Sequence, residues 1–309
     1  AMFARIAVLL LAGLALASCV AKAQTERPPE EFLAKVPSEF RPFVETCIRW
    51  DDWEKPAPPF KIYGNTYYVG TCGIAAILVT SDDGHMLIDS GTNAGADIVA
   101  ANIRSLGFAL TDIKGLLVSH EHFDHVGGMA KLQKLTGAEV YASRPAAPVV
   151  RSGKLSEDDP QFGMHDPMAP VANVRSVRGG ETGKVGGVSV TPIGTPGHTP
   201  GALSWTWKSC EDDICLNIVY ADSLSPVSRD DYKFSEHPDY LAAYYAGLER
   251  LARVDCDILI TPHPSHSRML KRMRYDTMIE PAACAYYATG KARDIEKRLK
   301  KEGAASDGQ

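Results

Sequence analysis

The sequence predicts an α/β protein built as one large domain, and three observations support this class. Patterns typical of short buried strands alternate with helical patterns from residue 61 to residue 300. The side chains best suited to bind metal or catalyse a reaction follow directly after a buried strand, where α/β proteins place their functional sites. The chain has 309 residues, 45% of them hydrophobic and 23% charged, which is sufficient for a large core.

Residues 1–23 are expected to be a secretory signal peptide, followed by a single domain over residues 24–309. Arg5 supplies a positive charge, and the apolar run of residues 6–16 is too short to cross a bilayer. The closing Ala-Lys-Ala suits signal peptidase, whereas the sequence ending at Cys19 resembles a bacterial lipobox, so a lipid-anchored product is the alternative. Both interpretations predict export to the periplasm, with no transmembrane segment in the mature chain.

Hydrophobic periodicity predicts the remaining elements in order. Short apolar or alternating runs predict strands over residues 61–80, 86–88, 111–119 (after a turn), 139–142, 185–193, 202–207, 216–220 and 257–261. Apolar residues spaced three and four apart predict helices over residues 93–106, 131–135, 145–150, 238–254 and 279–300. Residues 151–172 contain glycines and several prolines, so they are expected to form a loop at one rim of the site.

A cluster of potential metal ligands follows the buried strand of residues 111–119. His120 and His122 lie two residues apart, so extended backbone can point both imidazoles the same way. Asp124 and His125 come after the chain has turned and can face a second point close by. Imidazole and carboxylate groups without clustered cysteines favour zinc over calcium or an iron–sulfur cluster. The run therefore predicts two adjacent zinc ions.

This run resembles the signature of the metallo-β-lactamase superfamily, and three other motifs of that family occur in the same order. They are Met-Leu-Ile-Asp-Ser-Gly at residues 86–91, Thr-Pro-Gly-His-Thr-Pro-Gly at residues 195–201 and Thr-Pro-His-Pro at residues 261–264. The resemblance covers most of residues 60–265. It implies an αββα sandwich of two facing mixed β-sheets, with helices on both outer faces and the metals at one edge between the halves.

Residues 220–225, Tyr-Ala-Asp-Ser-Leu-Ser, favour one branch of the family. The segment looks like that of the third subclass of class B β-lactamases, whereas the first two subclasses place a cysteine ligand here. Glyoxalase II and related lactonases resemble the chain up to this point, but they use an aspartate in this region to bridge the two metals. A lactonase or thioester hydrolase with a bridging Asp222 therefore stays the alternative, and a non-catalytic zinc-binding protein is less favoured.

By the same resemblance, six side chains are expected to hold two Zn²⁺ per chain. They are His120, His122 and His198 for the first ion, and Asp124, His125 and His263 for the second. A metal-bound hydroxide would attack the β-lactam amide of penicillins, cephalosporins and carbapenems, which would confer antibiotic resistance. Asp124 would also orient that nucleophile or deliver a proton. A serine mechanism is not expected, because Ser-x-x-Lys does not occur in the chain.

The resemblance also assigns roles around the metals. Ser223 and Ser225 are expected to contact the carboxylate of the β-lactam substrate, with Ser223 bonded to a water on the second zinc. Asp89 is expected to support the metal loop or a ligand imidazole from behind. Glu121 is expected to face away from the metals as a solvated or supporting side chain, and His266 is expected on the surface rather than as a further ligand.

The seven cysteines leave an even set once Cys19 is set aside, and an even set fits an exported protein. Cys210 and Cys215 lie between two strand-like runs, so they can close a hairpin tip. Six cysteines allow many pairings; closeness in sequence and similarity to exported family members favour one of them. The expected pairs are Cys47–Cys72, Cys210–Cys215 and Cys256–Cys284.

Charge excludes one class of partner. The formal net charge of −5 argues against a nucleic-acid-binding surface. The basic residues of 291–301 are expected to form the solvated face of a helix. The expected partner is a small-molecule substrate, and the expected state is a monomer.

Overall fold

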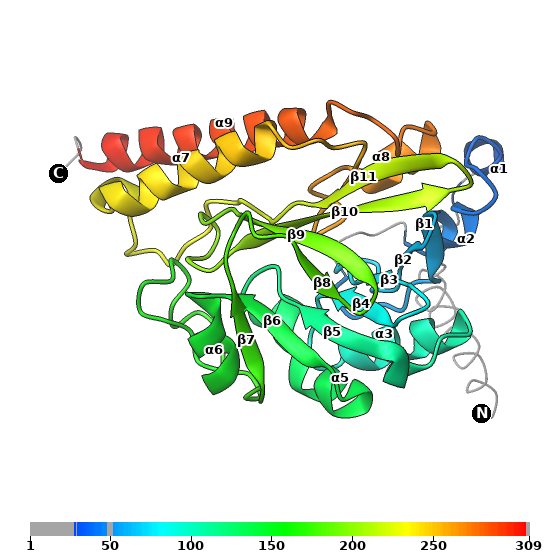
Figure 1. Ribbon diagram of the computed structural model, residues 1–309. Helices are drawn as coiled ribbons and strands as arrows, with labels where there is room; N and C mark the ends of the chain where they lie inside the picture. Colours follow the sequence, from blue (N-terminus) through cyan, green and yellow to red (C-terminus); the bar gives the residue numbers. More distant parts are fainter. Residues whose placement is uncertain (1–27, 29, 48–51, 307–309) are drawn as a thin grey trace, which may run out of the picture.

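Two β-sheets face each other in the computed structural model, which describes residues 28, 30–47 and 52–306 (Figure 1). The first sheet has the order β1 (Phe60–Tyr63), β2 (Thr66–Tyr68), β3 (Ile77–Val79), β4 (His85–Ile88), β5 (Ile113–Leu117), β6 (Glu139–Ser143) and β7 (Val174–Val177). The second has the order β12 (Ile258–Ile260), β11 (Ile214–Tyr220), β10 (Leu203–Glu211), β9 (Val188–Gly194) and β8 (Gly183–Val185). Both sheets contain parallel and antiparallel pairs.

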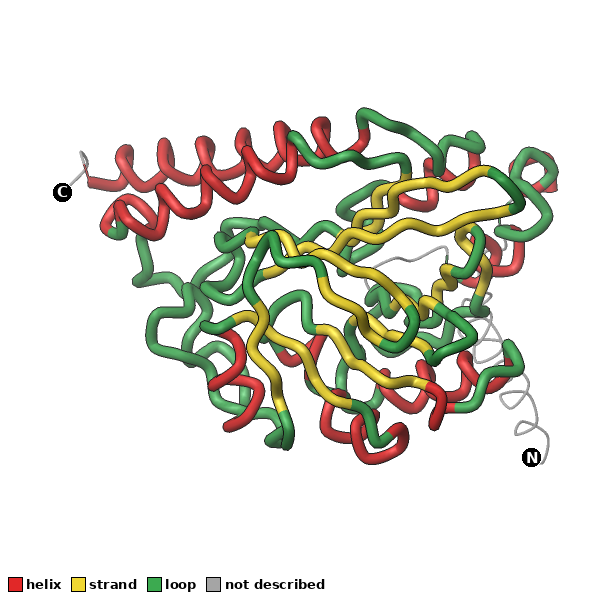
Figure 2. Tube along the Cα trace, viewed as in Figure 1, coloured by secondary structure: helices red, strands yellow, loops and turns green. Residues whose placement is uncertain are grey.

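Helices cover the outer face of each sheet (Figures 1 and 2). On the first sheet these are α3 (Gly95–Ser105), α5 (Met129–Thr136) and α6 (Ala146–Ser152). On the second sheet they are α7 (Pro238–Ala252) and α9 (Ala283–Ser306), which run side by side. The shorter elements are α1 (Glu30–Leu33), α2 (Arg41–Thr46), α4 (Phe123–Val126), α8 (Met269–Arg274) and the 3₁₀ turns η1 (Leu110–Asp112) and η2 (Phe234–Glu236).

The alternation of side chains along the strands creates the layers. In β4, Met86 and Ile88 belong to the core between the sheets, whereas Leu87 packs against the helices of the first sheet. From the second sheet, Trp205 and Tyr220 fill the same inner core, and both are almost completely buried. The predicted αββα sandwich is therefore confirmed.

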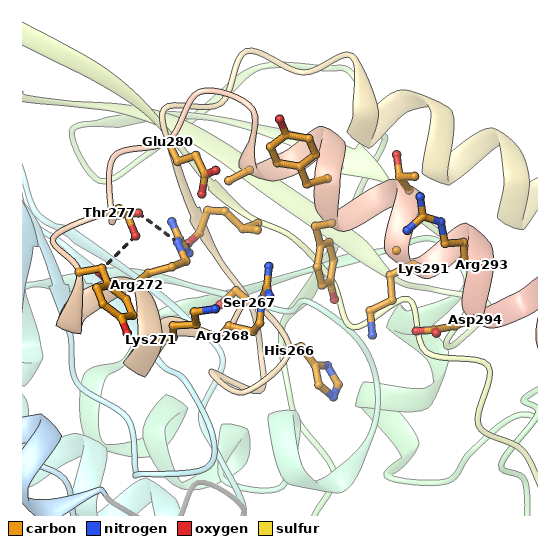
Figure 3. A pocket seen from close by; sticks show the side chains of 17 residues that line it. His266, Ser267, Arg268, Lys271, Arg272, Thr277, Glu280, Lys291, Arg293 and Asp294 are labelled. Atoms are coloured by element: carbon orange, nitrogen blue, oxygen red, sulfur yellow. Dashed lines mark hydrogen bonds between the residues drawn. The ribbon is translucent and has the colours of Figure 1, made fainter. Parts of the chain in front are cut away.

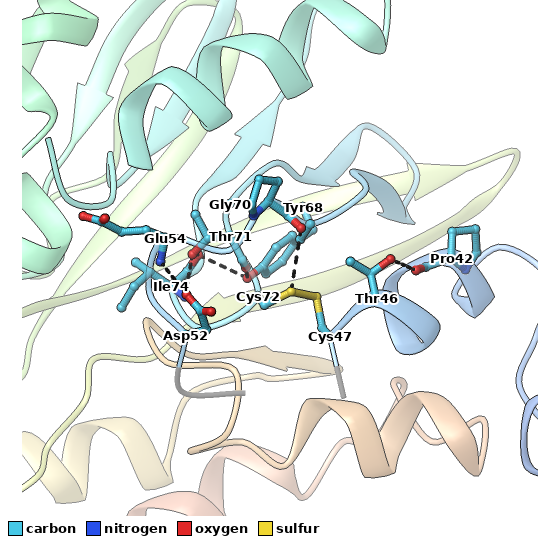
Figure 4. Close-up of a disulfide and its surroundings, with 12 residues drawn as sticks. Pro42, Thr46, Cys47, Asp52, Glu54, Tyr68, Gly70, Thr71, Cys72 and Ile74 are labelled. Carbon is cyan, nitrogen blue, oxygen red and sulfur yellow. Dashed lines mark hydrogen bonds between the residues drawn. A yellow bond between two sulfur atoms is a disulfide. The ribbon is translucent and has the colours of Figure 1, made fainter. Parts of the chain in front are cut away.

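Three disulfides lie within the described residues, and they join the cysteine pairs that the sequence analysis favoured. Cys47–Cys72 ties the segment after α2 to the loop that follows β2 (Figure 4). The Cys210–Cys215 disulfide closes the tip of the β10–β11 hairpin, where the two residues are register partners. The third disulfide, Cys256–Cys284, links the segment before β12 to the first turn of α9.

Some elements differ from the sequence-based expectation. The last helix begins at Ala283 rather than at residue 279, because Ile279 forms a β-bridge with Ile258 and Pro281 precedes the helix. The short elements α8, β7 and β8 were not predicted, since three to six residues are too few to show a period. The predicted signal peptide of residues 1–23, including Cys19, lies outside the described residues. Within the described residues, no helix combines the length and apolar character that crossing a membrane requires.

Candidate metal centre

Three loops bring the predicted ligands to one edge of the sandwich. The loop after β5 carries the first motif, which is the cluster His120, His122, Asp124 and His125. The β9–β10 turn carries His198, and the segment after β12 carries His263. The second sheet is joined to the end of β5 by the Leu203 amide, which donates to the Ser119 carbonyl at 2.7 Å, and by the Trp205 indole, which donates to the Val118 carbonyl at 3.0 Å. These bonds place the His198 turn beside the first motif.

The imidazoles of His120, His122 and His198 form a group that could hold one metal ion, with their potential ligand atoms within 4.8 Å of one another. The outward nitrogen of each ring has a partner. His120 Nδ1 lies 2.8 Å from Asp222 Oδ1, and His198 Nδ1 lies 2.8 Å from the Ser225 carbonyl. His122 Nε2 lies 3.2 Å from an oxygen of Asp159. Such contacts fix the ring orientations and leave the inward nitrogens free, as in zinc sites with carboxylate–histidine support.

A second group comprises Asp124, His125 and His263. Asp124 Oδ2 lies 3.0 Å from His125 Nε2 and 3.3 Å from His263 Nε2, and the two imidazole nitrogens are 3.3 Å apart. Ligand atoms about 2.0 Å from a tetrahedral zinc are about 3.3 Å from one another, so these separations suit zinc. His120 also lies within 4.8 Å of the Asp124 and His125 ligand atoms, so the two groups adjoin. The residues present therefore fit two neighbouring ions.

Three of the candidate ligands have pKa shifts that suit metal binding, and two do not. Burial and the neighbouring imidazoles hold the pKa of His120 and that of His198 well below the usual range, so both rings are neutral at pH 7. Burial would raise the pKa of Asp124, but the adjacent His125 and His263 outweigh it and hold that pKa well below its ordinary value. Neutral imidazole and ionised carboxylate are the forms that bind metal. The Asp159 carboxylate outweighs burial and raises the pKa of His122, while Asp124 and Asp89 outweigh burial and raise the pKa of His125 to about 10, so His125 must lose a proton when a metal binds. His120 Nε2 is buried without a hydrogen-bond partner in the structure, which fits an atom reserved for a metal.

Asp89 lies behind the metal loop, at the end of β4. Its carboxylate accepts hydrogen bonds from the Ser119 amide at 2.8 Å and the Ser119 hydroxyl at 2.6 Å. From the opposite sheet, the Tyr220 hydroxyl donates to the same carboxylate at 2.8 Å. Asp89 Oδ2 also lies 3.4 Å from His125 Nδ1. One carboxylate thus supports both the loop and a candidate ligand, and its backbone adopts a left-handed φ of 62° to do so.

Glu121 faces away from the metal groups, but it is buried rather than solvated. Its carboxylate accepts from the Thr199 hydroxyl at 2.7 Å and from the Gly201 amide at 2.9 Å, so it holds the turn that carries His198. Burial and the nearby Asp159 carboxylate raise the pKa of Glu121 to about 7. The solvated interpretation of this residue was wrong, because its partners lie about 80 residues further along the chain.

Ser223 and Ser225 follow β11 and lie at the edge of the first group. The Ser225 carbonyl is the partner of His198, and the Ser223 hydroxyl is buried with no hydrogen-bond partner in the structure. Leu224 between them adopts a left-handed φ of 47°, and the Tyr244 hydroxyl donates to its carbonyl. The serine segment is therefore held rigidly with one free hydroxyl.

Aromatic residues form part of the rim of the site. The Trp53 ring lies 5.6 Å from that of His263 and 5.8 Å from that of Phe123. The predicted rim loop contributes Phe162, which is 39% exposed and helps to line a cavity of about 240 Å³ beside His122 and Phe123. The loop-like composition of residues 151–172 was the sequence signal for this part of the rim.

Two expectations about surface residues fail. His266 is half-buried, with its ring 4.9 Å from that of His263 and its Nδ1 without a partner. Lys291, expected on the solvated face of α9, is only 8% exposed. His266 lies beside the second group, and Lys291 contacts Ser225 at the edge of the first, so neither side chain is in open solvent.

Comparisons with known proteins agree with this geometry. The model of the Metallo-beta-lactamase superfamily matches residues 69–263. The solved structure of the MIM-2 metallo-beta-lactamase is 54% identical with a TM-score of 0.82, covering 86% of this chain and 99% of that one. The structure of MEM-A1, a subclass B3 metallo-beta-lactamase from a soil metagenome library, is 42% identical with a TM-score of 0.79, covering 82% and 100% of the two chains.

Curated relatives carry a different name. A hydroxyacylglutathione hydrolase of Rhodopseudomonas palustris (strain BisB5) is 28% identical over 228 residues, which is 71% of this chain and 75% of the relative. The chain spans about half, 52%, of the length of a second hydroxyacylglutathione hydrolase, from Bradyrhizobium sp. (strain ORS 278).

Proposed function

The chain belongs to the metallo-beta-lactamase superfamily, and we propose on that basis that it is a zinc-dependent β-lactamase of the third class B subclass. The proposed reaction is hydrolysis of the β-lactam amide bond of penicillins, cephalosporins and carbapenems. The similarity to MIM-2, at 54% identity over 99% of that chain, supports this reaction over others of the superfamily.

Two zinc ions are the proposed cofactors. We assign His120, His122 and His198 to the first, and Asp124, His125 and His263 to the second. When bound, the ions would supply Lewis acidity, which lowers the pKa of water and polarises an amide carbonyl.

The residues of the chain itself supply orientation and proton handling. The outward ring nitrogens of the first group are held by Asp222, Asp159 and the Ser225 carbonyl. These contacts keep the three imidazoles from rotating away from the metal site. The Asp124 carboxylate is ionised at neutral pH and can accept or return a proton at its oxygens as the amide bond breaks. We propose that the Ser223 and Ser225 hydroxyls donate to the carboxylate of the substrate.

The position of Asp222 is the observation that carries the choice between hydrolases. Its Oδ1 lies 2.8 Å from His120 Nδ1, and its Oδ2 accepts from the Leu224 amide at 3.2 Å. Both oxygens are therefore used behind a ligand ring, away from the inward nitrogen of His120. This arrangement disfavours the bridging role that an aspartate plays in a glyoxalase II-type site. The thioester hydrolase remains a second candidate because of the curated relatives.

We propose that the protein works outside the cytoplasm. The signal-like residues 1–23 and the three disulfides are typical of an exported protein, with a lipid anchor on Cys19 as the alternative to a free periplasmic monomer.

The decisive experiment compares two kinds of substrate on the purified, zinc-loaded protein. Imipenem and nitrocefin should be hydrolysed, EDTA should abolish turnover and added zinc should restore it. S-lactoylglutathione, a thioester, should be turned over far more slowly. Rapid thioester cleavage without β-lactam cleavage would replace the proposal with the second candidate, and turnover of neither would contradict both.

A further inference from the structure

Lys291 is a buried cation without a carboxylate counter-ion. It lies on the inward stripe of α9, together with the buried residues Cys284, Ala288 and Ile295, which explains its 8% exposure. Burial of a charged amine is unfavourable unless the charge is compensated. Yet no carboxylate of the described residues lies within ion-pair distance of this amine, and Asp294 on the same helix is exposed to solvent.

The Lys291 amine contacts the serine segment of the candidate site. Its Nζ donates to Ser225 Oγ at 2.8 Å and lies 5.2 Å from the centre of the Tyr287 ring. The Tyr287 hydroxyl donates to the Ser223 carbonyl at 2.7 Å, so the same helix also fixes that segment. An ammonium group has three donors, and among the described residues this one has a single hydrogen-bond partner.

Two further polar atoms of the described residues lack a partner, one in the cavity that Lys291 lines and one on the serine segment that it contacts. His266 Nδ1 and the Ser223 hydroxyl are both buried and unpaired. Figure 3 shows the Lys291 amine and the His266 ring directed to the same side of a cavity of about 850 Å³. That cavity is lined by five lysine or arginine and two acidic side chains, and it reaches His266 beside the second group. In a chain of net charge −5, this local excess of cations attracts anions.

We infer that Lys291 binds the carboxylate of the β-lactam substrate and makes the enzyme selective for anionic substrates. The inference rests on the proposed function and deepens it: the charge that recognises the substrate comes from the C-terminal helix. The amine supplies the positive charge, and the Ser223 and Ser225 hydroxyls supply neutral donors beside it. A charge-assisted bond of this kind is stronger than a neutral one.

The experiment compares benzylpenicillin with its methyl ester, which has the same ring and no carboxylate charge. The zinc-loaded wild type should prefer the acid in kcat/KM by about 10–100-fold, the range of a hydrogen bond to a charged group. Lys291→Met should lose most of that preference through a higher KM for the acid, with the ester almost unaffected. Lys291→Arg should keep the preference, and Lys297→Met, which removes an exposed charge from the same helix, should behave as wild type.

The outcomes separate the two proposals. Equal turnover of acid and ester by the wild type would overturn the role of Lys291 while leaving the β-lactamase proposal intact. This comparison uses the wild-type protein alone. The same conclusion follows if Lys291→Met folds, as judged by circular dichroism, and keeps the wild-type preference. Preference lost in the methionine and arginine variants alike would assign the residue to packing, not to charge. If the wild type opens neither compound, the proposed function fails and this inference fails with it.

Discussion

Replacing Glu121 with alanine removes both acceptors that hold the turn carrying His198. The Gly201 amide and the Thr199 hydroxyl would then be buried donors without partners, since they lie 2.9 and 2.7 Å from the lost oxygens. Each such donor costs about 1–3 kcal/mol, so the free energy of unfolding should fall by about 2–6 kcal/mol. The same change loosens His198, and zinc affinity should drop about 10–100-fold, as for other groups that orient a ligand.

Glutamine is the matched control for this prediction. Its amide oxygen can accept from the Gly201 amide, and its NH₂ can donate to the Thr199 hydroxyl oxygen, so both contacts survive without the charge. Glu121→Gln should therefore cost less than about 1 kcal/mol and leave zinc affinity near the wild-type value.

The assay is urea unfolding in the same zinc-buffered solution for all three proteins, with a competing chromophoric chelator to measure zinc affinity. A common free zinc concentration is essential, because bound metal stabilises the folded state by mass action. Equal unfolding midpoints for the alanine variant and the wild type would refute the reasoning. So would a glutamine variant as unstable as the alanine variant, since the carboxylate charge rather than the two hydrogen bonds would then be responsible.

Three further predictions concern other parts of the chain. Asp159→Asn should weaken zinc binding about 10–100-fold in the chelator competition, with little change in the unfolding midpoint of the metal-free protein. The double change Cys256→Ser and Cys284→Ser should lower the free energy of unfolding in urea by about 3–4 kcal/mol, because that disulfide closes a loop with a sequence separation of 28. Burial lowers the pKa of Lys291 to about 8, although nearby carboxylates oppose it. The amine is charged below that pH and neutral above it, so KM for benzylpenicillin should rise between about pH 7 and about pH 9 and stay level in Lys291→Arg.

Local patterns in the sequence were sufficient to predict the candidate ligands and most of the strands and helices that form the layers. His120, His122, Asp124 and His125 are neighbours along the chain, so their spacing alone indicates two converging groups. The strands were predicted where buried runs are bounded by turn residues, as for β4 and β5.

The supporting residues could not be predicted in this way, because their partners are distant in sequence. Glu121 meets Gly201 across 80 positions, and Asp159 meets His122 across 37. Each looks like an ordinary surface acid until the fold brings its partner close. Lys291 was different: its place on the apolar stripe three residues after Ala288 and four before Ile295 was visible, but the surrounding basic residues favoured a solvated face. Periodicity was the better guide there than composition.

The Asp89 carboxylate receives donors from both halves of the molecule, Ser119 on one side and Tyr220 on the other. This has a consequence for recombination between relatives. Consider a chimera that takes the residues before β9 from one relative and the rest from another. It keeps this junction only if the first relative supplies Asp89 and Ser119 and the second supplies Tyr220. Crossovers that join parents with incompatible residues at these positions should impair the metal centre. Shuffling within the rim loop of residues 151–172 leaves this junction untouched, provided that Asp159, which contacts His122, is kept.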